Sequence, residues 1–231
     1  MKYFSSLLWS YLQKYGKNIE FVEQQCNFAP STLNILLTGL RFPRWNEIYA
    51  LAQIFQINPL KLIMPEEVIK KWQSNLHTWV ILDVDGVLTD NGIYISSRKV
   101  ETKRFNAKDG YAIKQMMRSH YQVAFLSNAK TKSIIAYRAG MLDVKLFYVG
   151  EEPKIEIFRR WTKKYSIIPD QVIYVGDDGN DLEMMEAVGF SVCPSDAYPL
   201  VLQKADLALF SKGGEGCISE LWEYMKLFKT F

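Results

Sequence analysis

The C-terminal two thirds of the chain alternates short apolar runs with longer stretches in which apolar residues recur at helical spacing. The runs predict strands, and the periodic stretches between them predict helices. The expected strands are 79–82, 123–126, 144–149, 172–175, 190–193 and 207–209. The expected helices are 109–120, 131–139, 153–165, 181–187 and 218–229. Such an alternation predicts an α/β fold with a Rossmann-like, parallel three-layer sheet.

Residues 1–72 follow a different pattern, with no convincing strand and several short runs at helical spacing. Asn18 is expected to cap a helix that ends near Cys26, and Ser31 to cap a helix from Thr32 to Leu37. The other expected helices cover residues 1–12, 45–55 and 58–64. We therefore expect an all-α domain over 1–72, a polar connector over 70–77 and an α/β domain over 76–231.

Residues 91–105 alternate on either side of Ser96 and Ser97, which predicts a β-hairpin after the first strand. No segment up to Lys154 has the length to fold as a separate cap over a site at the strand ends. Our hypothesis is that the hairpin helps a neighbouring subunit to close that site, and that the protein is an oligomer.

The composition predicts a reduced protein with a packed core. Hydrophobic residues make up 48% of the chain, and no apolar run approaches the ~18 residues that a membrane span needs. Three widely spaced cysteines without a Cys-x-x-Cys pair predict neither disulfides nor a zinc site, and they favour a cytoplasmic location. The two histidines, His77 and His120, are expected at the surface or in the linker.

Two carboxylates, Asp83 and Asp85, follow the first expected strand of the α/β domain, before a turn at Gly86. In an open α/β sheet, this end of a strand is where ligands bind. Two acids there repel each other unless a cation lies between them, and Mg²⁺ takes oxygen ligands and commonly accompanies substrate phosphate. An aspartate held against such a metal can attack phosphorus and form an aspartyl-phosphate.

Further polar residues stand beside the other expected elements. Ser127 follows the strand 123–126, and Lys154 opens a helix. Asp177, Asp178 and Asp181 follow the strand 172–175 in a glycine-containing turn. In this order the motifs resemble those of the haloacid dehalogenase superfamily of phosphotransferases, over about residues 76–231.

The resemblance implies a role for each of these residues. Asp83 would be the nucleophile and Asp85 the general acid and base, while Ser127 and Lys154 would bind the phosphoryl group. The implied cofactor is Mg²⁺, held by Asp83, the backbone carbonyl of Asp85 and Asp177. Asp178 and Asp181 would orient water ligands or Lys154.

Residues 83–90, 105–113 and the Gly213–Gly216 loop narrow the resemblance. They are similar to the 3-deoxy-D-manno-octulosonate 8-phosphate phosphatases, which are capless, Mg²⁺-dependent tetramers, and to relatives acting on nonulosonate 9-phosphates. This implies a homo-oligomer and a small-molecule sugar phosphate as substrate. The implied substrate contacts are Asn128, Lys103, Arg104, Lys108, Asp109 and Tyr111. Ala129 and Ser219 stand where the family usually has arginine, so the usual contacts to the substrate carboxylate are not implied, whereas the residues of the phosphatase chemistry are all present.

Residues 3–65 resemble the Cro/C1-type helix-turn-helix domain, which implies DNA as a partner. The residues implied to face DNA are Ser31, Thr32, Asn34, Thr38 and Arg41. The implied recognition helix, Ser31 to Thr38, has no Arg, Lys or Gln to read bases. A packing or oligomerisation role for the domain is therefore equally open. Residues 1–75 carry eight basic and five acidic residues, an excess of the sign that DNA needs, but a small one.

Two classes of function therefore remain. The first is a phosphatase. The second is a DNA-binding regulator that uses the phosphatase-like domain as a sugar-phosphate sensor. The complete set of Asp83, Asp85, Ser127, Lys154 and Asp177 favours the enzyme, because a sensor has no need of a nucleophile.

Overall fold

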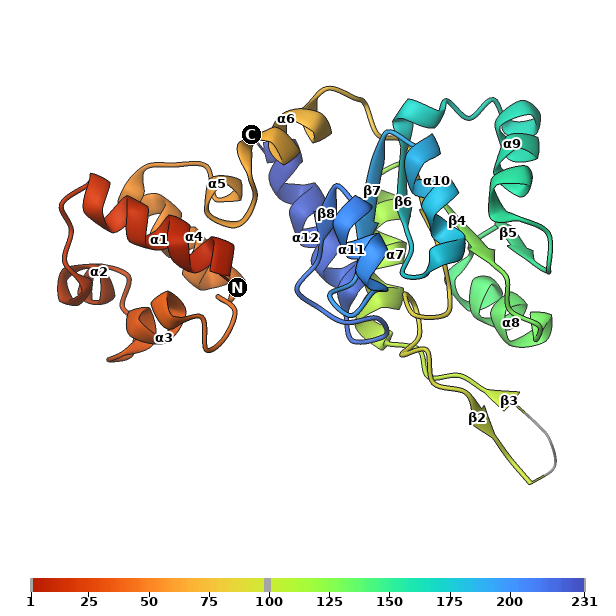
Figure 1. Cartoon of the computed structure of the whole chain (residues 1–231), viewed down its shortest axis with the longest axis horizontal. Coiled ribbons are helices and arrows are strands. Elements are labelled where there is room, and N and C mark those ends of the chain that lie inside the picture. The colour runs from red at the N-terminus through yellow and green to blue at the C-terminus, as the bar shows by residue number, and fades with distance from the viewer. Residues whose placement is uncertain (1, 98–100, 231) are drawn as a thin grey trace. The chain divides into compact units, whose positions relative to one another are not determined.

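The computed structural model describes residues 2–97 and 101–230 (Figure 1). The chain divides into two compact units, Met1–Lys70 with Lys226–Phe231 and residues 71–225. The first unit is helical and the second is built on a parallel sheet. Among the described residues, no helix is long and apolar enough to cross a membrane.

The helical unit is formed by short helices around a small apolar core. These helices are α1 (Lys2–Lys14), α2 (Ile19–Gln25), α3 (Thr32–Thr38), α4 (Trp45–Phe55) and α5 (Leu60–Ile63). Each helix from α1 to α5 except α2 places at least one fully buried leucine or phenylalanine in that core, among them Leu8, Leu36, Phe55 and Leu60. The helical spacing of these side chains was the signal in the sequence, and their burial stabilises helices too short to persist alone.

The start of α3 differs from the expectation. Asn18 caps α2 as predicted, accepting a hydrogen bond from the Phe21 amide at 2.7 Å. Ser31, however, has a left-handed backbone (φ 66°) and makes no side-chain cap, so that prediction is wrong. The carboxylate of Glu23 in α2 caps α3 instead, accepting from the Ser31 amide at 3.3 Å and the Leu33 amide at 2.7 Å.

The expected polar connector is also wrong over its first residues. Helix α6 (Glu66–Gln73) continues through its first half, because Ile69 and Trp72 form a buried face. The Trp72 ring lies 4.7 Å from the His77 ring and 4.9 Å from the Phe190 ring, between centroids. His77 is therefore buried against two aromatic rings, not exposed in a linker, and its Nε2 lies 3.2 Å from the Trp72 carbonyl oxygen.

The α/β unit has the predicted parallel sheet, in the order β5-β4-β1-β6-β7-β8. The strands are β1 (Trp79–Leu82), β4 (Gln122–Ser127), β5 (Leu146–Val149), β6 (Val172–Val175), β7 (Phe190–Cys193) and β8 (Leu207–Ala208). Every pair is parallel, with Leu82 opposite both Phe125 and Val175. The central strand β1 is thus flanked by the two strands whose ends carry the other motifs.

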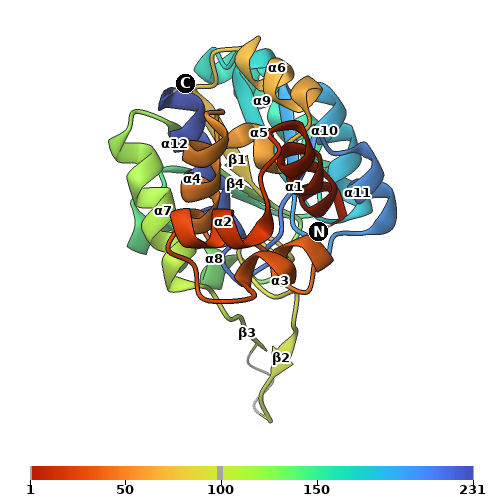
Figure 2. The same cartoon turned by 90° about the vertical axis from the view of Figure 1, so that its left-hand side faces the viewer.

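Helices cover both faces of this sheet (Figure 2). On one face lie α9 (Lys154–Tyr165), α10 (Leu182–Ala187) and α11 (Pro199–Lys204), and on the other lie α7 (Ala107–Arg118), α8 (Lys132–Leu142) and α12 (Cys217–Thr230). The first face has a core built around Phe158, Trp161 and Met184, against alternate strand residues such as Ile81 and Tyr174. Two short 3-10 turns, η1 (Pro169–Gln171) and η2 (Gly179–Asp181), flank β6.

A two-stranded antiparallel ribbon projects from the α/β unit after β1 (Figure 1). Its strands are β2 (Tyr94–Ile95) and β3 (Glu101–Thr102), which confirms the predicted hairpin. Residues 98–100 of that prediction lie outside the described residues. Between β1 and β4, the residues that are described form this ribbon and α7 and no cap domain.

Candidate active site

The sheet order brings the predicted motifs to one edge. Asp83 follows β1, Ser127 ends β4 and Asp177 lies just beyond β6, and these three strands are neighbours. All three therefore lie at the carboxyl edge of a parallel sheet, where ligands bind. They border a cleft lined by Asp83, Asp85, Asn91, Ser127, Asn128, Ala129, Lys154, Asp177, Asp178 and Asn180.

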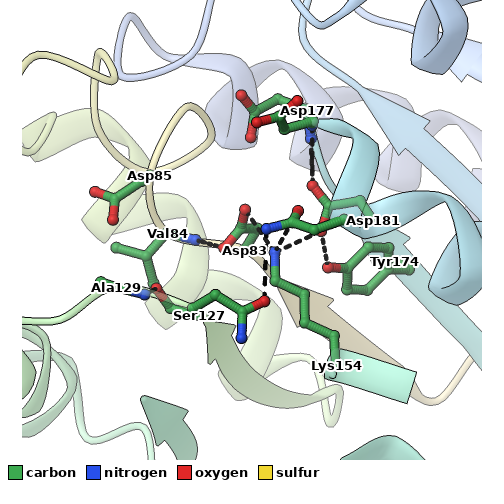
Figure 3. A network of polar contacts seen from close by, with 12 residues as sticks. Asp83, Val84, Asp85, Ser127, Ala129, Lys154, Tyr174, Asp177 and Asp181 are labelled. Atoms are coloured by element: carbon green, nitrogen blue, oxygen red, sulfur yellow. Dashed lines mark hydrogen bonds and ion pairs between the residues drawn. The ribbon is translucent and has the colours of Figure 1, made fainter. Parts of the chain in front are cut away.

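Asp83 is buried and held from two sides (Figure 3). Its Oδ1 accepts a hydrogen bond from the Val84 amide at 2.6 Å, and its Oδ2 lies 2.8 Å from Nζ of Lys154. Burial raises the pKa of Asp83 to about 7; attraction to Lys154 lowers the pKa and repulsion from Asp181 raises it. The ion pair and the amide thus give the Asp83 carboxylate a defined orientation.

Lys154 is the buried cation of the cleft. Its Nζ lies 2.5 Å from Oδ1 of Asp181 as well as 2.8 Å from Asp83. Burial by itself lowers the pKa of Lys154, but the attraction of the two carboxylates outweighs it, and the pKa is raised. Lys154 is therefore protonated at neutral pH.

Asp181 holds the network together. It is fully buried and accepts from Nζ of Lys154, from the Tyr174 hydroxyl, and from the amides of Asp177 and Asp178 at 2.9 and 3.0 Å. Both of its oxygens are occupied by these donors. Asp181 is thus placed to orient Lys154 and to shape the turn of Asp177 and Asp178, while the exposed Asp178 accepts from the Gly179 amide.

Asp177 is short of a positive partner. Its Oδ1 is buried and, within the described part of the chain, has no hydrogen-bond partner. Burial raises the pKa of Asp177 to about 8, and repulsion from Asp83 and Asp181 adds to the increase. Oxygens of Asp83, Asp177 and Asp181 lie within 4.8 Å of one another, an arrangement that fits a divalent cation with oxygen ligands.

Gly86 leaves the room that this acidic cluster needs. Its φ is +80°, and a Cβ at this position would lie 1.9 Å from Oδ2 of Asp177. A side chain at position 86 would therefore strain the turn and displace a carboxylate from the cation site.

The general acid/base candidate Asp85 lines the same cleft, and one of its oxygens pairs with a lysine of the hairpin. Its Oδ1 lies 2.7 Å from Nζ of Lys103 at the base of the hairpin. Burial lowers the pKa of Lys103, but its hydrogen bonds to Asp85 and Glu101 raise it more. The ammonium group of Lys103 is therefore engaged with protein carboxylates, although the sequence suggested a contact with substrate.

The loop after β4 carries Ser127 and Asn128. Ser127 is buried, and its hydroxyl oxygen accepts from the Ala129 amide at 3.1 Å. The side-chain amide of Asn128 donates to the carbonyl oxygens of Gly150 at 2.7 Å and Glu152 at 2.9 Å. Asn128 thus lines the cleft while its donors tie two neighbouring loops together.

Most of the remaining predicted substrate residues lie outside the cleft lining. Arg104 pairs with Asp90 at 2.9 Å, and Lys108 and Tyr111 are exposed on α7. Asp109 is 1% exposed, and its Oδ1 accepts from the Ser219 amide at 2.8 Å. Burial raises the pKa of Asp109 to about 6. Asp109 therefore anchors the start of α12.

The glycine loop before α12 packs against the turn that follows Asp83 and Asp85. The Gly214 amide donates to the Val87 carbonyl at 2.9 Å. A Cβ at Gly213 would lie 1.9 Å from the Gly86 carbonyl oxygen, and one at Gly214 would lie 2.4 Å from the Asp90 amide nitrogen. Only glycine permits this close approach, so residues far apart in sequence support the turn that carries Asp83 and Asp85.

Sequence reasoning missed several polar members of the site. Asn91 and Asn180 line the cleft, and the Tyr174 hydroxyl is buried on Asp181. Tyr174 was counted only as a strand residue, although a phenol inside an otherwise aliphatic buried strand needs a partner, and this was an available signal.

Comparisons with known proteins agree with this geometry. A family profile described as haloacid dehalogenase-like hydrolase matches residues 131–218. The 3-deoxy-D-manno-octulosonate 8-phosphate phosphatase KdsC of Salmonella typhi is 38% identical over 148 residues, which cover 64% of this chain and 78% of that protein.

Solved structures give the same result. The 3-deoxy-D-manno-octulosonate 8-phosphate phosphatase of Yersinia pestis matches with a TM-score of 0.68 and 33% identity, over 72% of this chain and 89% of that one. The enzyme of Moraxella catarrhalis was solved with a magnesium ion, a phosphate ion and a KDO molecule. It matches with a TM-score of 0.66 and 25% identity, over 73% of this chain and 97% of that one.

The fold and the acidic cleft thus define a phosphatase of the haloacid dehalogenase superfamily. Within that superfamily, the chain belongs to the KdsC-type phosphatase family. The predicted Mg²⁺ cofactor is confirmed at the level of the family, since the acidic cluster fits a divalent cation and the Moraxella catarrhalis enzyme was solved with magnesium.

Proposed function

We propose that the protein hydrolyses the phosphate ester of an acidic 2-keto-3-deoxy sugar, of the 3-deoxy-D-manno-octulosonate 8-phosphate class, with Mg²⁺ as cofactor. The observation that carries this proposal is the ion pair of Asp83 with Lys154 beside Asp177. Among the described residues, Oδ1 of Asp177 has no hydrogen-bond partner. The substrate class comes from the relatives, which are named for this activity.

Asp83, the backbone carbonyl of Asp85 and Asp177 would hold the metal ion. When bound, Mg²⁺ offsets the repulsion between these carboxylates and the substrate phosphate. Lys154, 2.8 Å from Asp83, supplies a second positive charge, and the Ser127 hydroxyl donates to a phosphoryl oxygen.

The reaction runs in two halves. The Asp83 carboxylate attacks phosphorus while the bond from phosphorus to the sugar oxygen breaks, and that oxygen takes a proton from Asp85. Asp85, now ionised, then takes a proton from water, whose oxygen attacks phosphorus while the bond from phosphorus to the Asp83 oxygen breaks. Inorganic phosphate leaves, and both aspartates return to their starting forms.

Phosphate release from a panel of sugar phosphates, with and without Mg²⁺, tests this function. We expect turnover that requires the metal and that Asp83→Asn abolishes. Equal rates for the wild type and the variant would refute Asp83 as the nucleophile.

The panel must also include nonulosonate 9-phosphates, since one observation favours this second substrate class. Ala129 and Ser219 replace two arginines that are usual in the octulosonate family, and the Ser219 amide is occupied by Asp109. A higher kcat/KM for the nine-carbon ester would move the assignment to that class without changing the mechanism.

For the helical unit, we infer a Cro/C1-type helix-turn-helix domain over residues 1–72, preceding the phosphatase domain at 76–231. The support is the pair α2 and α3 joined by a short turn, with Glu23 linking them. Of the residues implied to face DNA, Ser31 and Asn34 are exposed and Thr38 bonds to backbone carbonyls of its own helix. Thr32 is buried, which runs against its predicted role, and Arg41 pairs with Glu47 at 2.6 Å.

We therefore favour a packing or oligomerisation role for this unit over DNA reading and over a sensor-regulator. Fluorescence anisotropy with random and genomic duplexes at low salt tests this choice. No sequence-selective binding is expected, because the implied recognition helix has no Arg, Lys or Gln to read base edges. Tight selective binding would restore the regulator hypothesis.

We also propose that the enzyme is a homo-oligomer, a tetramer by family resemblance, and that it acts in the cytoplasm. The support is the projecting hairpin, where Ile93 is 74% exposed and Ile95 68% exposed, as a surface covered by a partner would be in the isolated chain. Light scattering of the full chain tests the assembly, and a fully active monomer would refute it.

A further inference from the structure

Both observed contacts of the Asp85 side chain use the same oxygen. Nζ of Lys103 lies 2.7 Å from Oδ1, and the Thr89 hydroxyl donates to Oδ1 at 3.3 Å. Among the described residues, Oδ2 has no protein partner, and Asp85 lines the cleft. Oδ2 is therefore the oxygen available to exchange a proton with a substrate or with water.

Lys103 is itself fixed from the other side. Its Nζ lies 2.9 Å from Oε1 of Glu101, and the other oxygen of Glu101 accepts from the Thr131 hydroxyl. Thr131 immediately precedes α8, in the loop that begins at Ser127. The Lys103 side chain is only 5% exposed, so its ammonium group cannot exchange these partners freely with water.

We propose that Lys103 is a positioning residue for Asp85: it holds Oδ1 and thereby presents Oδ2 toward the leaving-group oxygen. The inference rests on the proposed function, since it assumes that Asp85 is the general acid. The contacts from Lys103 through Glu101 to Thr131 join the base of the hairpin to the loop proposed to bind phosphate. Together with the Lys103–Asp85 pair, they fix the positions of Asp85, the hairpin and that loop relative to one another.

The physical reason is the geometry of proton transfer. The proton on Oδ2 must reach the sugar oxygen while the bond to phosphorus breaks, and a carboxyl group free to rotate is misaligned most of the time. Lysine suits this role because its ammonium group has three donors, two of which contact Asp85 and Glu101 here.

The test compares two leaving groups in Lys103→Met. The value of kcat/KM reports only the steps up to formation of the aspartyl-phosphate, in which Asp85 acts as the acid. A primary alkyl phosphate needs that proton, whereas p-nitrophenyl phosphate departs as a stable anion without it. We expect kcat/KM to fall about 10- to 100-fold for the best alkyl phosphate of the panel, and less than about threefold for p-nitrophenyl phosphate.

Lys103→Arg is expected to recover a large part of the alkyl activity, because it restores a cation against Oδ1. The matched control is Lys145→Met, at an exposed lysine on the opposite edge of the sheet. It should leave kcat/KM unchanged for both substrates. Mg²⁺ affinity, from the thermal shift with added metal, should be the same in Lys103→Met and wild type.

Equal losses on both substrates would overturn the proposal and leave Lys103 a purely structural role. No loss on either substrate would overturn it as well. The proposed substrate class fails separately, if the wild type prefers an unrelated alkyl phosphate, and the comparison of leaving groups can then be made with that ester.

Discussion

The two units of the chain treat buried charge in opposite ways. In the α/β unit, three carboxylates gather at one edge of the sheet, and the pKa values of Asp83 and Asp177 rise to about 7 and about 8, mainly because they are buried. In the helical unit, Glu47 is equally buried but accepts two hydrogen bonds from Arg41 and one from the Arg44 amide. Burial alone would raise the pKa of Glu47, yet these bonds lower it.

The difference separates structure from function. A buried charge with all its partners stabilises the fold it sits in, whereas a buried cluster with more carboxylates than cations is retained only where binding or chemistry requires it. The expected consequence is that substitutions in the cleft lose activity and keep stability, and that substitutions at Glu47 do the reverse.

The largest effect is expected for Asp177→Asn. It removes a proposed metal ligand and one of the clustered carboxylates, so kcat/KM at fixed Mg²⁺ should fall about 10³-fold or more. The metal-free variant should melt at a higher temperature than the metal-free wild type. Calorimetry and phosphate release check both, and a variant that is less stable and still active would break the comparison.

The next effect concerns the space beside Asp177. Gly86→Ala should weaken Mg²⁺ binding about 10- to 100-fold, because the new methyl group displaces the carboxylate and the backbone there has a positive φ. Isothermal titration with the metal measures it. Gly179→Ala is the matched control, since nothing lies within 4 Å of its added Cβ. Equal affinities in the two variants would contradict the cation site.

Asp109 is a buried carboxylate outside the cation site whose pKa is also raised, so its ionisation should also cost folding stability. The folded pKa of Asp109 is about 6, above its ordinary 3.8, so the folded state binds the proton more tightly than the unfolded state. Stability that depends on Asp109 is therefore lost as pH rises from about 4 to about 6, and is constant above that window.

Relative to the wild type, Asp109→Asn should gain up to about 3 kcal/mol of unfolding free energy between pH 4 and pH 7. Urea unfolding at several pH values gives this difference, and the titrations of Asp83 and Asp177 cancel because both proteins share them. Asp143→Asn, at an exposed carboxylate, should give a flat difference. A flat difference for Asp109→Asn as well would show that its burial carries no strain.

The smallest effect is expected in the helical unit. Glu47→Ala leaves Arg41 and the Arg44 amide without their acceptor, and should destabilise that unit by about 2 kcal/mol, since Arg41 is partly exposed. Phosphatase kcat/KM should be unchanged. Hydrogen exchange of the amides of α4 measures the loss, and protection equal to the wild type would refute the structural role of Glu47.

The sequence was sufficient where the signal was local. The strands β1, β4 and β6 are compact apolar runs, and a polar residue at the end of such a run needs no further information to be placed at the sheet edge. Asp83, Ser127 and Asp177 were therefore predictable, as was the parallel sheet, once the strands were seen to alternate with helices.

The errors arose where a long-range contact decides the outcome. Ser31 lost its capping role to Glu23 on the preceding helix, and His77 is buried because Trp72 and Phe190 enclose it. The pairing of Lys103 with Asp85 joins residues 18 positions apart. No periodicity or local propensity encodes such pairs, because they depend on how the elements pack.

The glycine loop at Gly213 and Gly214 has a consequence for biosynthesis. Gly213 and Gly214 pack against the turn that follows Asp83 and Asp85. A growing polypeptide therefore cannot complete this cleft until residues 213 and 214 have left the ribosome. We therefore expect a nascent chain that ends before this loop to lack support for the turn of Asp83 and Asp85, although it already contains both side chains.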